Sequence, residues 1–150
     1  MAYVFAFLHH VAAFALVSML VVEAVLINEV LTLKSARRLQ LADLAFGVSA
    51  GVVLVIGFLR VFYFEKGASY YFHSVPFLAK MSLFAVVGLL SIYPTGEFLS
   101  WGKTLKHGLL PHIDDRKIRV IRSIIQVELG GIILLIFCAV LMARGVGYIG

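Results

Sequence analysis

The chain has 150 residues, of which 62% are hydrophobic and 14% charged, and its mean hydropathy is +1.03. A water-soluble domain of this composition would expose a very large apolar surface, so we expect an integral membrane protein with a single domain over residues 1–150. The lone Cys138 excludes a disulfide framework, and we interpret the net charge of +5 as a topology signal rather than as nucleic-acid binding.

The first predicted helix runs from about Tyr3 to about Leu31 and includes an uncharged apolar run over residues 2–22. His9 and His10 lie inside this run. Ionisable groups at membrane depth usually face a bundle interior, a cavity or a cofactor. Adjacent helical residues point about 100° apart, so one of the two histidines faces the bundle axis, and the spacing does not say which.

Three further apolar segments are each long enough to cross the hydrocarbon core of a bilayer. They run from about Gln40 to about Phe64, from about Val75 to about Leu99 and from about Arg122 to about Arg144. The expected connections are short, over residues 34–40, 66–74 and 102–117. Short connections make consecutive helices antiparallel. We therefore expect an all-α integral membrane protein, an antiparallel bundle of four transmembrane helices.

Lysine and arginine predict the orientation of this bundle. The cationic residues of the first and third connections and their flanks are Lys34, Arg37, Arg38, Lys103, Lys106, Arg116, Lys117 and Arg119. The second connection has only Lys66, and no cationic side chain precedes His9. The positive-inside rule therefore places the first and third connections in the cytoplasm and both termini outside.

This topology sorts the unusual residues by depth. The basic and imidazole groups expected near the outer face are His9, His10, Arg60, His73 and Lys80. The carboxyl groups expected in the inner half are Glu23, Asp43, Glu97 and Glu128. An inward imidazole is a ligand for haem iron, and basic side chains at the same depth could bind the haem propionates. The pattern predicts a haem b site near the outer face, with Arg60 and Lys80 as propionate partners.

Each feature also has a structural interpretation. Arg60 and Lys80 could extend to lipid headgroups, and Glu23 and Glu128 could pair with Arg122 or Lys34. The small residues Gly47 and Gly51 are four positions apart, a spacing typical of close helix packing.

Several runs of the sequence are distinctive. They are residues 7–10 (FLHH), 57–62 (GFLRVF), 65–67 (EKG), 70–73 (YYFH), 76–81 (PFLAKM) and 141–145 (LMARG). With these runs the chain resembles an uncharacterised family of small bacterial membrane proteins, known as domain of unknown function 2214. The resemblance covers essentially the whole chain. It implies the bacterial inner membrane as location and supplies no activity.

A remoter resemblance is to the HemJ-type protoporphyrinogen oxidases and the related CopD-like membrane proteins. It implies that His9 is the iron ligand and that Lys80 and Glu128 are functional polar residues. The tryptophan-rich stretch that follows the histidine in HemJ is absent, and Ser91-Ile92-Tyr93-Pro94 stands where aromatic and histidine residues are expected. The second axial ligand is therefore not identified.

The leading hypothesis is a haem b-binding inner-membrane protein with a redox role. The sequence leaves open whether it is an enzyme; in that case Glu23 and Glu128 would move protons, and a quinone or porphyrinogen would be the substrate. One alternative is a non-catalytic accessory subunit or assembly factor of a larger membrane complex. Another is metal or small-solute transport, which would need a homo-oligomer because four helices leave little room for an aqueous path.

Overall fold

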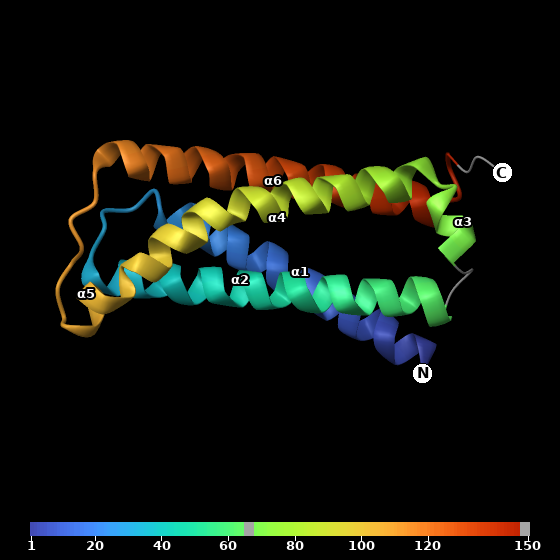
Figure 1. Ribbon diagram of the computed structural model, residues 1–150, viewed down its shortest axis with the longest axis horizontal. Coiled ribbons are helices and arrows are strands. Elements are labelled where there is room, and N and C mark those ends of the chain that lie inside the picture. The colour runs from blue at the N-terminus through green and yellow to red at the C-terminus, as the bar shows by residue number, and fades with distance from the viewer. Residues whose placement is uncertain (65–67, 148–150) are drawn as a thin grey trace.

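The structure is a computed structural model and describes residues 1–64 and 68–147. Throughout these residues the regular structure is helical (Figure 1). The elements are α1 (Ala2–Leu26), α2 (Leu33–Leu59), the π-helical segment η1 (Arg60–Phe64), α3 (Ala68–Phe72), α4 (Val75–Ser100), α5 (Gly102–Lys106) and α6 (Asp115–Ala143). The long helices α1, α2, α4 and α6 run antiparallel to one another in chain order, which confirms the predicted bundle.

Within the described residues, four helical stretches are long and apolar enough to cross a membrane: 2–26, 33–64, 75–106 and 115–143. Helix α1 begins, and α6 ends, at the end of the bundle that carries α3 (Figure 1). We call this the α3 end. The opposite end carries α5 and is called the α5 end. Most lysines and arginines of the chain lie at the α5 end, as the sequence predicted for one face of the membrane.

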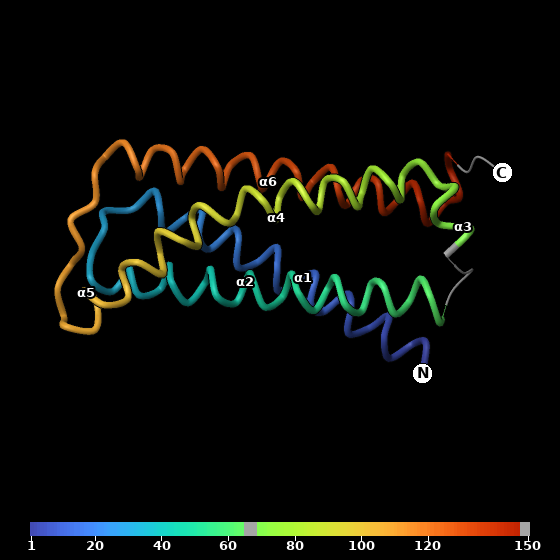
Figure 2. The backbone as a smooth tube through the Cα atoms, viewed as in Figure 1, coloured from blue at the N-terminus to red at the C-terminus, as the bar shows by residue number. Residues whose placement is uncertain are grey.

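The helices pack mainly as two pairs, α1 with α2 and α4 with α6. Helix α4 runs beside α6 at the α3 end and crosses toward α2 at the α5 end (Figure 2). The fully buried side chains gather where the pairs meet: Leu20, Leu39, Phe98, Ile121 and Ile125. A smaller apolar cluster forms at the α3 end around Val61, Tyr71 and Phe77. The pairs are thus joined tightly at the α5 end and more loosely at the α3 end.

The predicted connection over residues 34–40 is wrong, because these residues form the first turns of α2. Helix α1 ends at Leu26 and not near Leu31, and α2 begins at Leu33. Thr32 caps α2: its Oγ1 accepts from the Ser35 backbone at 3.1 Å, and the Ser35 Oγ accepts from the Thr32 backbone at 2.7 Å. A polar run at the end of a membrane helix stays helical when a cap satisfies its free N–H groups.

The other connections also contain helical turns. Helix α6 begins at Asp115 rather than near Arg122, and the Asp114 side chain accepts a hydrogen bond from the Arg116 backbone at 3.2 Å. The expected third connection also contains α5, and the second contains α3. Residues 65–67, with Lys66, lie outside the described residues. The predicted third helix is correct to within one residue, since α4 covers Val75–Ser100.

The predicted packing role of Gly47 and Gly51 is wrong within this chain. A Cβ atom added at either position would meet no atom within 4 Å, so neither glycine makes a close contact with another described helix. The close helix contact occurs elsewhere. A Cβ atom on Gly131 of α6 would lie 2.8 Å from Cγ2 of Val87 on α4, so the absence of a side chain at Gly131 lets these helices touch.

Candidate functional site

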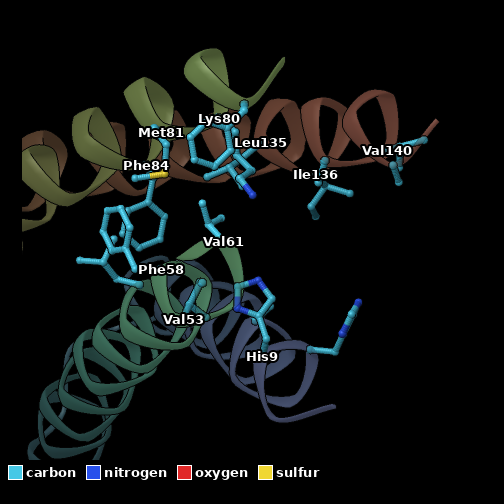
Figure 3. Close-up of a pocket in the computed structure, with 17 residues that line it drawn as sticks. His9, Val53, Phe58, Val61, Lys80, Met81, Phe84, Leu135, Ile136 and Val140 are labelled. Carbon is cyan, nitrogen blue, oxygen red and sulfur yellow. The ribbon is translucent and has the colours of Figure 1, made fainter. Parts of the chain in front are cut away.

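A cavity of about 440 Å³ lies between the two helix pairs at the α3 end (Figure 3). Residues of α1, α2, η1, α4 and α6 line it, so all four long helices contribute to its wall. Its surface is mostly aliphatic and aromatic, with Phe58, Phe77 and Phe84 among the lining side chains. Of the described residues on its wall, His9, His10 and Lys80 are ionisable.

His9 is half-buried and points from α1 into the space between the helix pairs (Figure 3). Its ring packs against Gly57 of α2, where an added Cβ atom would lie 3.4 Å from the His9 Cε1 atom. The Nδ1 atom is buried and forms no well-aligned hydrogen bond among the described residues, although the backbone of Val53 interacts with the ring. Packing between the helices therefore holds the imidazole, and its Nδ1 atom is left without a well-aligned hydrogen bond among the described residues.

His10 differs from its neighbour. It is exposed, and its Nδ1 lies 2.6 Å from the carbonyl oxygen of Ala6 in the preceding turn of α1. The His9 and His10 rings are nearly perpendicular, at 87°, with their centroids 6.1 Å apart. Both touch the cavity, but His9 is the imidazole directed toward the bundle axis.

Lys80 enters the cavity from α4, on the wall opposite His9 (Figure 3). It is half-buried, and its Nζ lies 5.5 Å from the centre of the Phe77 ring. Arg60, the first residue of η1, is half-buried but is not part of the cavity wall. Both cations are close enough to His9 for their charges to act on the imidazole. The structure thus brings His9, Arg60 and Lys80 to one end of the bundle, as expected.

Two of the predicted site residues lie away from this cavity. His73 is exposed just after α3, and its Nδ1 lies 2.7 Å from the Ser69 carbonyl oxygen. Glu128 is buried toward the α5 end, where the Ser91 hydroxyl contacts its carboxyl group. Neither lines the cavity that contains His9 and Lys80.

Met81 also lines the cavity, and sequence reasoning missed it. A thioether is one of the side chains that ligate haem iron opposite histidine. An isolated methionine in an apolar helix carries no sequence signal that separates a ligand from packing. Among residues 1–64 and 68–147, no group of three or more His, Cys, Asp or Glu side chains is arranged to bind a metal ion.

Comparison with protein families matches residues 1–147 to the family model of the predicted membrane proteins DUF2214. The comparisons with curated proteins and with solved structures gave no match. The match covers nearly the whole chain, so the protein belongs to the DUF2214 family of predicted membrane proteins.

Proposed function

We propose that this DUF2214 membrane protein binds a haem b group in the cavity at the α3 end and has a redox role. The observation that carries the proposal is the shared position of His9 and Lys80. These residues come from different helices and lie on opposite walls of one mostly apolar cavity. An imidazole and a primary amine that face one cavity can bind a single ligand carrying both a metal ion and anionic groups.

The cavity fits haem in three respects. Its aliphatic and aromatic wall suits a flat apolar macrocycle. The His9 ring lies against the backbone of α2 and is directed into the cavity, which suits an imidazole held on one side and ligating on the other. Lys80, with Arg60 nearby, supplies positive charge for the propionates. Met81 also lines the cavity, and its thioether would be able to help hold the haem iron.

Haem in such a site would supply one-electron chemistry. The residues of this chain would bind the group, exclude water from it and set its potential through burial and the charges of Arg60 and Lys80. If the protein is an enzyme, we assign substrate contact to Lys80, because Glu128 lies outside the cavity. The substrate class that fits an apolar, membrane-embedded cavity is a quinone or a porphyrinogen.

We further propose that the α3 end faces the outside of a bacterial inner membrane. The cationic residues at the α5 end support this orientation. They lie in the first turns of α2 (Lys34, Arg37, Arg38), in α5 (Lys103, Lys106) and in the first turns of α6 (Arg116, Lys117, Arg119).

The test is an absorption spectrum of the detergent-purified protein, oxidised and reduced with dithionite, together with a pyridine haemochrome assay. We expect a Soret band, sharp reduced α and β bands, and close to one haem per chain. A colourless protein, even after expression with a haem precursor, contradicts the proposal. Stoichiometric co-purification with other membrane proteins would then indicate an accessory subunit, and chelator-removable metal would indicate transport.

A further inference from the structure

Three carboxyl groups meet inside the bundle toward the α5 end. Glu23 of α1, Asp43 of α2 and Glu128 of α6 are 2%, 5% and 1% exposed. They lie close enough for their charges to act on one another, since both Asp43 and Glu128 interact electrostatically with Glu23. Among the described residues none of the three forms an ion pair. Three carboxylates buried together without a cation would be very costly, so the cluster must retain protons.

The hydrogen bonds of Ser91 indicate where one proton lies. The Ser91 Oγ of α4 is 2.8 Å from the Val87 carbonyl oxygen and 2.5 Å from Oε1 of Glu128. A hydroxyl has one proton to donate, and a carbonyl oxygen can only accept. Both contacts are hydrogen bonds if Ser91 donates to Val87 and Glu128, as a carboxylic acid, donates to Ser91.

The other two carboxyl groups, those of Asp43 and Glu23, differ in their hydrogen bonds. The Thr95 hydroxyl of α4 donates to Oδ1 of Asp43 at 2.8 Å. Oε1 of Glu23 is buried and has no hydrogen-bond partner in the described part of the chain. A buried oxygen without a partner is rare and costly. Oε1 of Glu23 is therefore an oxygen without a hydrogen-bond partner, next to carboxyl groups that retain protons.

Among residues 1–64 and 68–147, no cationic side chain is paired with these three carboxyl groups. Helix α4 contributes only the hydroxyls of Ser91 and Thr95. Arg122 of α6 donates to the Ile27 carbonyl oxygen at 3.3 Å, beyond the end of α1. Glu97 of α4 is paired with Lys117, at 2.8 Å, on a more exposed side of the bundle. Protons are thus the positive charges available to the three carboxyl groups.

A second cavity, of about 210 Å³, adjoins the first. Its wall includes Ser91 and Thr95, the two residues whose hydroxyls contact the carboxyl groups. It shares Val53, Phe84 and other lining residues with the cavity that contains His9. Ser91 and Thr95 therefore contact the carboxyl groups and also line a space that adjoins the His9 cavity.

We propose that Glu23, Asp43 and Glu128 form a proton-binding site in the membrane interior, and that Ser91 and Thr95 connect it to the second cavity. In release, the acid O–H bond of Glu128 breaks and its proton passes to the Ser91 oxygen. The hydroxyl proton of Ser91 leaves its hydrogen bond to the Val87 carbonyl oxygen and passes to a water molecule in the cavity. Uptake is the reverse. The site requires no haem, so its test is independent of the proposed cofactor.

The test is infrared spectroscopy of the purified, cofactor-free protein at neutral pH in H₂O and in D₂O. A protonated carboxyl group gives a C=O stretching band, apart from the amide and carboxylate bands, that shifts in D₂O. We expect such a band in the wild type and its loss or strong reduction in Glu128→Gln. The matched control is Glu97→Gln, which removes a partly buried carboxyl group of α4 that is ion-paired with Lys117 and should leave the band unchanged.

Ser91→Ala provides a second, milder variant. It removes the acceptor of the Glu128 proton but leaves every carboxyl group in place, so the band should persist at a shifted frequency. The proposal is wrong if the wild type shows no protonated carboxyl band. It is also wrong if the band survives unchanged in Glu128→Gln and Ser91→Ala. Because haem is absent throughout, neither result depends on the redox proposal.

Discussion

The imidazole of His9 lies in space that Gly57 leaves free. A Cβ atom on Gly57 would be 3.4 Å from the His9 Cε1 atom, which is van der Waals contact, and any larger side chain would enter the ring's position. The direction of His9 therefore depends on a small residue of the neighbouring helix.

Replacing Gly57 with valine should displace the imidazole from the cavity and at least halve the haem content per chain. The branched side chain would occupy the volume that the ring now fills. Gly51→Val is the matched control, because a Cβ atom at Gly51 meets nothing within 4 Å. The measurement is the pyridine haemochrome assay on both purified variants. Equal haem content in the two would show that the contact does not position a ligand.

The two histidines should behave differently. We expect His9→Ala to lose bound haem and His10→Ala to keep most of it, because His9 is directed into the cavity and His10 is exposed with its Nδ1 beside the Ala6 carbonyl. The reduced absorption spectrum of each variant checks this. Loss of haem in His10→Ala alone would refute the assigned ligand.

Haem binding should require the positive charge of Lys80. We expect Lys80→Met to lower haem occupancy several-fold and Lys80→Arg to restore much of it, because a propionate partner needs a cation whereas packing tolerates methionine. His73→Ala is the control, since His73 is exposed outside the cavity. Haem titration of the apoprotein measures the effect. Full binding by Lys80→Met would assign Lys80 a packing role.

The adjacent glycines of α6 should respond oppositely to alanine. A Cβ atom on Gly131 would lie 2.8 Å from the Val87 side chain, whereas one on Gly130 meets nothing within 4 Å. We expect Gly131→Ala to destabilise the fold by about 1–3 kcal/mol through overpacking. Gly130→Ala should be neutral or stabilising by about 0.5–1 kcal/mol because alanine favours helix. Unfolding in detergent measures both, and equal effects would contradict the close α4–α6 contact.

The orientation can be tested with single cysteines in a Cys138→Ser background. Leu109, just after α5, and Val146, just after α6, are both exposed and lie at opposite ends of the bundle. We expect a membrane-impermeant maleimide added to intact cells to label a cysteine at position 146 and not one at 109. The reverse labelling pattern would overturn the proposed orientation.

The helices could be predicted from sequence because each is a single apolar run. The ends of the helices were predicted less accurately, because residues 34–40 and 115–121 are rich in charged and polar side chains and yet helical. The caps that extend α2 and α6, Thr32 and Asp114, belong to residue types that favour helix starts, so a sequence signal existed there. Apolar length alone underestimates a membrane helix that continues beyond the hydrocarbon core.

The candidate site was only partly predictable. The depth of His9, Arg60 and Lys80 follows from their positions along each helix, so their occurrence at one end could be expected. The exclusion of His73 from the cavity and the presence of Met81 on its wall could not be inferred in this way. The position of Met81 depends on the direction of its side chain around α4, and that of His73 on how the chain turns between α3 and α4.

By itself the sequence determined the membrane class, the antiparallel helices and the charge difference between the two ends, because these properties depend on composition and order along one chain. Only the tertiary structure decided that His9 faces Gly57 and that Glu128 meets Ser91, which is 37 residues away. In a soluble helix a polar face marks the outside. Here α1 is apolar on nearly every face, so the rotation of each helix is set by packing against its neighbours.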